Sequence, residues 1–454
     1  MVIFTGIGAA SRPSSTTRHK NQILQLQDSP RFPYLHRKGS FGHRCRLLIV
    51  KFGGSSLSNP KRINLAVASV ALEYARGNHV VVVVSAVGNT TDQLLQLTNG
   101  GAELVETDKD DILAMGERTS ARIFAASLKS RGMQARYYDP SDRDWPIITD
   151  NNFLNANPLK TNSIKRIRRY LKPVLDDGMI PVIGGFIGRT RDGRISTLGR
   201  GGSDTTALLL AMALEADEVV LVTNVRGILS ADPNLVGNAR VLSKIDMKTL
   251  IGIADTGTKF IHRKALRFKD PNINIRVISN TNGKLDSQGT LVTGGSLPEL
   301  EVTLNNPHPV ASVTIVGTGL PRQPELVQKI SKLVGPNLVA VSQDRDSAIL
   351  YVKQTPKLQQ QITRLHDAML NDPHGIAIAA RMGMALITVR SIGLEERPGV
   401  VARISDALRS ANINMFGVLT ITSSVLVFVD WKIRRKAASL IRSSLEKNCL
   451  TSMP

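Results

Sequence analysis

The 454-residue chain has little cysteine, few aromatic residues, fewer acids than bases and no long hydrophobic run. Its two cysteines, Cys45 and Cys449, lie near opposite ends without metal-ligand spacing, which argues against a disulfide scaffold and for a reducing compartment. The longest aliphatic run, Val80 to Val84, is far shorter than a membrane span and is typical of a buried parallel strand. We therefore expect a globular protein without a membrane partner.

Acidic residues are scarce: 58 Lys and Arg face 37 Asp and Glu, for a net charge of +21. Such an excess raises nucleic acid as a partner, because Lys and Arg supply phosphate affinity without sequence specificity. However, aromatic residues make up only 4% of the chain, which leaves few platforms for base stacking. Beyond residue 46 the basic residues are scattered rather than massed in one stripe. We therefore expect a small anionic substrate and no nucleic acid.

The first 46 residues have a different composition, with eight Lys or Arg, the single acid Asp28 and no sustained apolar periodicity. We predict a disordered extension here. One interpretation is an organelle transit peptide, and the other is sequence upstream of a true start near Leu47. The second needs a non-standard start codon, since no methionine lies between Met1 and Met115. The expected location is the cytoplasm, or an organelle if the extension is a transit peptide.

From Leu47 onward, short Val- and Ile-rich strands alternate with amphipathic helices, which predicts a mainly parallel sheet covered on both faces. The expected strands are LLIVKFGG from Leu47, HVVVVVSAVG from His79, GMIPVIGGFIG from Gly178 and EVVLVTNV from Glu218. The expected helices cover residues 63–76, 91–104 and 110–130, with another after Gly202.

Each expected strand runs into small or hydroxyl residues at its carboxyl end, where ligands bind in such folds. These residues are Gly53, Gly54, Ser55 and Ser56, then Ser85 to Gly88, Gly184 and Gly185, and Thr223 and Asn224. We expect the four strand ends to converge on one binding site.

The stretch TLGRGGSDTT places Gly201 and Gly202 directly before a helix. Glycine costs backbone entropy, so a pair here indicates that a ligand approaches the main chain closely. The free N–H groups of a helix start bind anions, and Arg200 adds a forked donor. The alternative is an ordinary helix start capped by Ser203 or Asp204.

The last third of the chain contains an internal repeat. VTIVGTGLPRQPELVQKISKLV from Val313 aligns with ITVRSIGLEERPGVVARISDAL from Ile387, and each copy ends in an amphipathic helix, at 357–370 and 432–445. Each unit reads strand, helix, strand, strand, helix. A duplicated unit of this kind predicts either a paired small-ligand sensor or an oligomerisation module without a ligand.

Taken together, these motifs resemble the aspartate kinases, members of the amino acid kinase family with two C-terminal ACT domains. The resemblance rests on VKFGGSS, VSAVGNTTDQLL, MGERTSA, TLGRGGSDTTA, GILSADP and GTKFIHRKAL, which follow in the family's order. It implies a three-layer αβα sandwich of the amino acid kinase type, followed by two α+β, ferredoxin-like ACT domains. The implied boundaries are an extension at 1–46, a catalytic domain at 47–297, and ACT domains at 306–372 and 380–454.

The implied reaction is ATP-dependent phosphorylation of the side-chain carboxylate of L-aspartate to 4-phospho-L-aspartate, the first step toward lysine, threonine and methionine. An aspartate side chain has an ordinary pKa of about 3.9, so it is already a nucleophile at neutral pH. Catalysis then depends on positioning and charge neutralisation. The resemblance also implies feedback regulation and a homo-oligomer through the ACT domains. The alternatives are another amino acid kinase and a regulatory subunit that binds amino acids without catalysis.

The candidate acceptor site combines one acid with a forked base, because a free amino acid offers an ammonium and carboxylates. By resemblance Glu117 holds the amino group and Arg200 a carboxylate; the alternative for Glu117 is a solvated helix residue. The further substrate residues implied are Ser85, Thr91 and Ser203. The implied catalytic residues are Lys51, Arg200 and Gly54, with the Lys51 ammonium on the transferring phosphate. The alternative for Lys51 is a solvated lysine at a strand end.

The implied nucleotide site departs from the family pattern. Its residues are Lys51, Gly53, Gly54, Ser55, Gly201, Gly202, Thr223, Asn224, Leu229 and Lys259. Where the family has Thr-Asp-Val-Asp-Gly-Ile-Tyr, residues 223–229 read TNVRGIL, without the two acids and the aromatic ring. We expect this departure to affect the affinity for the nucleotide more than the reaction itself. Mg²⁺ is implied, held mainly through the phosphates, because no dedicated cage of acids is evident and no protein metal ligand is predicted.

The two repeat copies differ at the turn that opens their first helix. Pro398 and Gly399 keep the family's Pro-Gly, whereas the first copy has Pro324 and Glu325. Main-chain N–H groups at such a turn can face an amino-acid carboxylate. The resemblance therefore implies one effector class, lysine or threonine, bound near residues 393–399 or at the interface between the repeats.

Overall fold

The computed structural model describes residues 45–99, 104–254, 261–295, 300–304, 307–317, 332–370, 375–391, 394, 398–421 and 423–446. Residues 1–44 of the expected extension, Lys259, and the first-copy turn at Pro324 lie outside these ranges. Among the helices that are described, none is long and apolar enough to cross a membrane.

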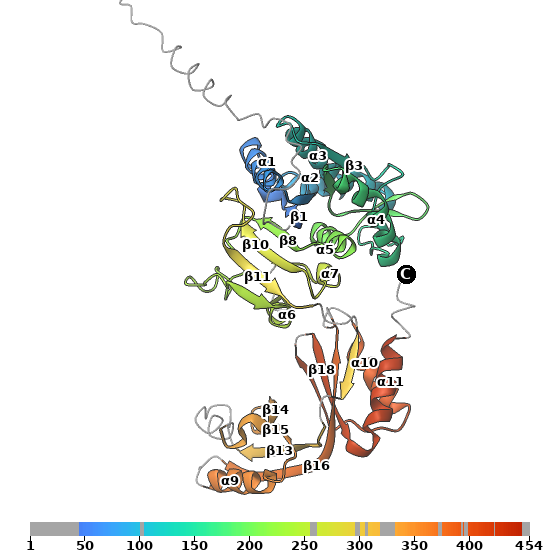
Figure 1. The fold of residues 1–454 in the computed structure, drawn as a ribbon. Coiled ribbons are helices and arrows are strands. Elements are labelled where there is room, and N and C mark those ends of the chain that lie inside the picture. Colours follow the sequence, from blue (N-terminus) through green and yellow to red (C-terminus); the bar gives the residue numbers. More distant parts are fainter. Residues whose placement is uncertain are drawn as a thin grey trace, which may run out of the picture.

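Within the described residues, eight strands form one sheet in the order β3-β5-β2-β1-β8-β10-β11-β9 (Figure 1). Its strands are β1 (Leu47–Phe52), β2 (His79–Val84), β3 (Ala135–Tyr138), β5 (Ile180–Gly184), β8 (Glu218–Thr223), β9 (Lys244–Asp246), β10 (Asn274–Ser279) and β11 (Gly289–Thr293). The neighbours from β3 to β10 all pair in parallel, and only β11 runs antiparallel to β10. The predicted parallel sheet is confirmed.

The helices of this part are α1 (Pro60–Ala75), α2 (Thr90–Asn99), α3 (Glu106–Lys129), α4 (Lys160–Asp176), α5 (Gly202–Leu214), α6 (Met247–Ala254) and α7 (Arg263–Leu266). Successive strand residues point to opposite faces, so Ile49 enters one core and Leu48 and Val50 enter the other. The first core includes α4 and α5, and the second includes α1 and α3. This arrangement is the predicted αβα sandwich.

The expected strand over residues 178–188 is wrong in one respect, because it splits into two. β5 ends at Gly184, and β6 (Ile187–Thr190) belongs to a small separate sheet with β4 (Ile148–Thr149) and β7 (Ile195–Thr197). Between them Phe186 adopts a left-handed conformation with φ of +68°. Gly185 lies so close to α5 that an added Cβ would be 2.7 Å from the Ser203 Cβ. The chain must therefore turn where the sequence pattern suggested continuity.

The C-terminal part forms a second sheet, in which the described strands follow the order β14-β15-β13-β16-β18-β17, with β12 paired to β16. Its strands are β12 (Glu301–Leu304), β13 (Val310–Gly317), β14 (Leu338–Gln343), β15 (Ser347–Lys353), β16 (Gly375–Arg390), β17 (Gly417–Ile421) and β18 (Ser424–Asp430). Its helices are α9 (Leu358–Leu370), α10 (Val400–Arg409) and α11 (Arg434–Glu446). The second copy has the predicted order of elements, and the first helix of the first copy falls outside the described residues.

Each repeat gains a fourth strand that the five-element pattern did not contain. The first part of β16 pairs with β13, and the remainder pairs with β18. β12 pairs with residues 387–390 of β16, so a segment that precedes the first repeat completes the second one. The resulting order β12-β16-β18-β17 is that of a ferredoxin-like sheet. β16 therefore belongs to both repeats.

Replacing Val302 by alanine tests whether β12 supports the second repeat. Val302 is 3% exposed and packs in the core formed by β16, β18, α10 and α11. We expect Val302→Ala to destabilise this part by about 1 to 3 kcal/mol. Leu304→Ala is the control, because Leu304 is 37% exposed. Urea unfolding followed by the fluorescence of Trp431, which packs on the same core, measures both variants. Equal losses would contradict the assignment.

Candidate active site

The carboxyl ends of β1 and β2 meet the first turn of α5. Lys51 of β1 places its Nζ 2.7 Å from Oδ1 of Asp204 in α5, and the two side chains are only 17% and 13% exposed. Ser85, directly after β2, donates a hydrogen bond of 3.0 Å from its hydroxyl to that of Ser203. Two strand ends and the glycine-rich block are thus joined by an ion pair and a hydroxyl contact. The alternative of a solvated Lys51 is wrong.

The start of α5 is uncapped by side chains, so the interpretation of Ser203 or Asp204 as an ordinary cap is wrong. The N-cap is Gly201, at a φ of +73°. An added Cβ at Gly201 would lie 2.0 Å from the Cβ of His262, so only glycine fits there. Ser203 and Asp204 are free of capping and point instead to Ser85 and Lys51.

Glu117 of α3 is buried beside these groups, with 3% of its surface exposed. Its Oε1 accepts a 3.0 Å hydrogen bond from the Ala86 amide, whereas its buried Oε2 has no partner in the described part of the chain. Burial raises the pKa of Glu117 from its ordinary 4.5 to about 7, although the Ala86 amide and the charge of Lys51 act in the opposite direction. The alternative that Glu117 is a solvated helix residue is therefore excluded. One of its carboxylate oxygens is left to accept a bond from a cationic partner.

Small residues bring α3 this close to the strand ends. An added Cβ at Gly116 would lie 2.7 Å from the Ala86 Cβ, and one at Gly184 would lie 3.3 Å from the Glu117 Cβ. Larger side chains at either position would push the Glu117 carboxylate away from the end of β2.

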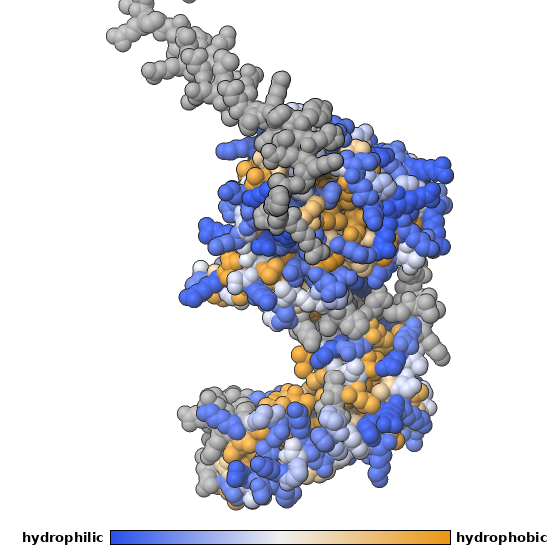
Figure 2. Space-filling view, in the orientation of Figure 1, coloured by the Kyte–Doolittle hydropathy of each residue, from blue (hydrophilic) through white to orange (hydrophobic). Residues whose placement is uncertain are grey.

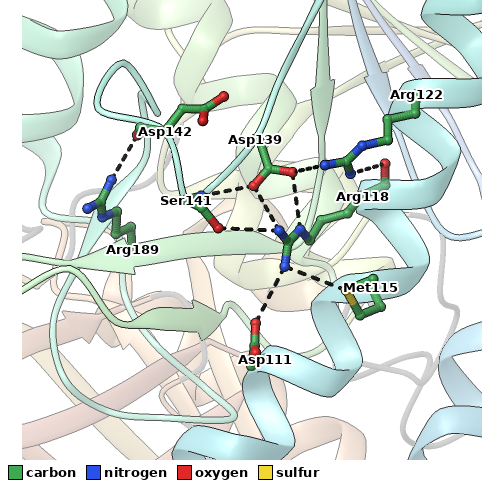
Figure 3. A network of polar contacts seen from close by, with 8 residues as sticks. All are labelled: Asp111, Met115, Arg118, Arg122, Asp139, Ser141, Asp142 and Arg189. Carbon is green, nitrogen blue, oxygen red and sulfur yellow. Dashed lines mark hydrogen bonds and ion pairs between the residues drawn. The ribbon is translucent and has the colours of Figure 1, made fainter.

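The opposite side of α3 is anchored by a polar network (Figure 3). Arg118 donates two hydrogen bonds, of 3.0 and 3.2 Å, to the carboxylate of Asp139, which follows β3. Arg122 donates to the same carboxylate. Asp139 is only 5% exposed, and these arginines together with the Ser141 amide hold its pKa below the ordinary value, although burial acts against them. The network fixes the turn of helix that carries Glu117.

The glycines that follow β1 lie in a tight turn. An added Cβ at Gly54 would be 2.6 Å from the carbonyl oxygen of Gly88, so the turn between β1 and α1 packs on the loop after β2. The Gly53 amide donates to the Val222 carbonyl at 3.2 Å, and the Gly202 amide to that of Gly199 at 3.0 Å. The main-chain donors of these two implied nucleotide-site residues are therefore already satisfied inside the protein.

The loop that the resemblance assigns to the nucleotide follows β8. Thr223 and Asn224 stand at its carboxyl end, joined by a 3.3 Å hydrogen bond between their side chains. Leu229 bridges to Val241, so residues 228–242 form a hairpin that leaves the sheet. Within it the Asn234 amide donates to the Asp232 side chain at 2.8 Å, a contact typical of a turn.

Three other predicted site residues make no hydrogen bond or ion pair with the groups above, within the described part of the chain. Arg200 is exposed and carries no ion pair or hydrogen bond within the described residues. Thr91 is half-buried in the first turn of α2, where its neighbour Thr90 hydrogen-bonds the Val87 carbonyl at 2.6 Å. Gly399 is the N-cap of α10 with a φ of +78°, and Pro398 before it is exposed.

Sequence reasoning missed Asp204 as the partner of Lys51. The acid was recognised only as a possible cap, because the two residues are far apart in the sequence and no local pattern joins them. The closeness of Asp204 to the glycine pair is the one signal that pointed to it.

Comparisons with known proteins show the family and the fold. The model of the amino acid kinase family matches residues 46–279. The aspartokinase of Mycolicibacterium smegmatis is 30% identical over 417 residues, which are 88% of this chain and 96% of that protein. The aspartokinase of Geobacillus stearothermophilus is 30% identical over 403 residues, 85% of this chain and 94% of that protein. The crystal structure of aspartate kinase from Synechocystis has a similar fold, with a TM-score of 0.71 at 24% identity, over 88% of this chain and 69% of that one.

The pKa of Glu117 predicts a pH-dependent stability. Because the folded chain binds this proton more tightly than the unfolded chain, the contribution is complete below pH 4.5 and is lost as the pH rises through about 7. Relative to Glu117→Gln, the native chain should lose on the order of 3 kcal/mol between pH 4.5 and pH 8. Urea unfolding at both pH values measures this difference.

The control for this measurement is Glu215→Gln, since the side chain of Glu215 is 80% exposed. It should follow the native chain at both pH values. A constant difference between the native chain and Glu117→Gln would show that Glu117 titrates as it does in water.

Proposed function

The chain belongs to the amino acid kinase family and, within it, to the aspartokinases, and from this we propose how its residues transfer phosphate from ATP to the side-chain carboxylate of L-aspartate. The product is 4-phospho-L-aspartate, the precursor of lysine, threonine and methionine. The observation that carries the proposal is the buried Glu117 carboxylate, with one unpaired oxygen at the strand ends that also hold Lys51.

Glu117 binds the ammonium of the amino acid. A buried carboxylate oxygen without a partner is costly, and an ammonium placed against it removes that cost. A substrate whose amino group is acylated offers no such cation, so the site favours a free amino acid over an N-acyl one. The hydroxyls of Ser85 and Ser203, which bond one another nearby, and that of Thr91 complete the polar surface toward the substrate.

Lys51 neutralises the transferring phosphoryl group. Its ion pair with Asp204 fixes the ammonium at the end of β1, so little reorganisation is needed when negative charge develops. One carboxylate oxygen of the substrate forms a bond to the γ-phosphorus, and the bond from that phosphorus to the bridging oxygen of ATP breaks. ADP leaves with that oxygen, and no proton has to be removed from the nucleophile.

Arg200 binds a carboxylate of the substrate. Its guanidinium is exposed and has no partner among the residues described, so its forked donors are available. The glycines around it let the loop approach a ligand closely.

The nucleotide lies toward Gly54, Ser55, Thr223, Asn224 and Leu229, at the adjoining strand ends. Mg²⁺ fits this site only through the phosphates, because the described residues contain no group of three potential metal ligands and Asp204 is already paired with Lys51. When bound, the ion neutralises phosphate charge. Leu229 offers an adenine an apolar contact without stacking.

The first experiment incubates the protein with ATP, Mg²⁺ and a panel of acidic amino acids, and traps the acyl phosphate with hydroxylamine. We expect hydroxamate from L-aspartate alone. Lys51→Ala should lower kcat by about 10²- to 10³-fold because it removes charge stabilisation in the transition state. Glu117→Gln should mainly raise KM for aspartate, and the exposed Glu215→Gln should change neither constant.

A different result would assign a different function. Hydroxamate from another amino acid would make the chain a different amino acid kinase. Amino-acid binding without product from any acceptor would show that the altered nucleotide loop has left a sensor rather than a catalyst.

We also propose that the C-terminal repeats bind an amino-acid effector and join copies of the chain. Two ferredoxin-like units and the glycine-capped start of α10 support the first point. Figure 2 supports the second, because hydrophobic side chains gather on the visible face of the C-terminal sheet. Among the exposed hydrophobic residues of β16 are Ile376 and Met382, at 69% and 42% exposure.

Lysine and threonine, added separately to the hydroxamate assay, test the effector. We expect one of them to inhibit, and Gly399→Ala to weaken that inhibition about tenfold, because alanine is strained at a φ of +78°. Gly383→Ala is the control, since its φ of +72° imposes similar strain away from the α10 turn. Equal effects of the two variants would contradict an effector site at α10.

A further inference from the structure

Arg200 lies in the segment of residues 197–202, which begins with the last residue of β7 and contains a main-chain hydrogen bond from the Gly202 amide to the Gly199 carbonyl. A second segment, residues 154–156, packs beside it: an added Cβ at Gly199 would lie 2.8 Å from Oδ1 of Asn155. The Ala156 amide donates to the Thr197 carbonyl at 2.9 Å, which joins the two segments at their base. Two charged side chains that the proposed chemistry does not use meet at this junction, the buried Asp110 and the half-buried Lys264.

The first charge is Asp110 in α3, whose surface is fully buried. Its Oδ2 accepts the Leu154 amide at 3.0 Å and the Thr197 amide at 2.9 Å, and its Oδ1 accepts the Thr197 hydroxyl. One carboxylate therefore binds N–H groups from both segments. Burial raises the pKa of Asp110, and these three donors act against that rise.

The second charge is Lys264 in α7. Its Nζ lies 2.7 Å from the Ala156 carbonyl, 2.8 Å from that of Leu198, and 3.1 and 3.0 Å from the main-chain and side-chain oxygens of Asn155. One ammonium therefore binds carbonyl groups from the same two segments. Burial lowers the pKa of Lys264 to about 8, which still leaves the cation predominant at neutral pH.

We propose that Asp110 and Lys264 act as a clamp of opposite charges that positions the loop carrying Arg200. Asp110 takes the N–H groups of the two segments and Lys264 takes their C=O groups. Neither main chain can then shift without leaving several of these polar groups unpaired, which is unfavourable wherever water cannot replace the lost partner. Both are positioning residues, and their effect on kinetics rests on the proposed role of Arg200.

Limited trypsin digestion tests the clamp independently of any activity. Trypsin cleaves after Arg200, which is exposed, only when the loop opens far enough to enter the protease. In Lys264→Met we expect the cut between Arg200 and Gly201, followed by mass spectrometry, to be at least about tenfold faster. Asp110→Asn should accelerate the same cut, because an amide group would face the donors that the carboxylate binds.

Lys269→Met is the matched control. Lys269 is buried more deeply than Lys264, and its Nζ also donates to main-chain carbonyls, those of Asp270 and Gly294, at 2.6 Å each. Burial lowers its pKa to about 8 as well. Its loss should destabilise the protein without exposing Arg200. Equal acceleration at Arg200 in the two lysine variants, or none in Lys264→Met and Asp110→Asn, would overturn the clamp.

Kinetic measurements then test whether the clamp supports substrate binding. If the native chain forms aspartyl hydroxamate, Lys264→Met should raise KM for aspartate about tenfold or more with a smaller change in kcat, because a displaced Arg200 weakens substrate binding. In Lys264→Ala, propylammonium supplies the missing carbons and ammonium, and it should restore KM, whereas sodium at equal ionic strength should not. An unchanged KM, or no rescue, would contradict the link to substrate binding. If the native chain makes no product, the proposed function fails while the digestion still decides the clamp.

Discussion

The candidate site depends on one buried carboxylate oxygen that has no hydrogen-bond partner among the described residues. Glu117 is held by the Ala86 amide on one oxygen, and burial holds its pKa near 7. The packing around it is specific: Gly116 and Gly184 let α3 approach the strand ends, and the Arg118–Asp139 network fixes the helix from the other side. A folded chain tolerates such a cost where a ligand relieves it, and in the proposed function the ammonium of an amino acid is that ligand.

The neighbouring charged groups differ from Glu117, because each already has hydrogen-bond or ion-pair partners. Lys51 pairs with Asp204, Asp110 accepts from three donors, and Lys264 binds four oxygens. A charged group that already has its partners fixes the position of those partners. Moving it would leave them without a hydrogen bond or ion pair, which costs free energy. The site therefore combines a frame of paired charges with Glu117 and Arg200, the two groups to which the proposed function assigns the substrate.

The C-terminal sheet has a different kind of constraint, which is the continuity of one strand. β16 completes the first repeat with its first part and begins the core of the second with the rest. β12, which comes directly after the kinase part, completes the second repeat. A change in either repeat therefore acts on a strand that the other one uses, and the second repeat is tied to the chain that leaves the kinase fold. Such shared strands are a physical route by which an effector could act on the site.

Local patterns in the sequence determined the alternation of strands and helices, the parallel sheet and the repeat, because periodicity and glycine placement depend on neighbouring residues alone. The same patterns identified Lys51, Glu117 and Arg200 through their motifs. Tertiary structure decided what those motifs could not contain: the pairing of Lys51 with Asp204, the occupied amides of Gly53 and Gly202, the turn at Phe186 and the place of β12. Each of these depends on groups distant in the sequence that meet only when the sheet has formed. The pKa of Glu117 belongs with them, because burial is a property of the folded chain and not of any segment.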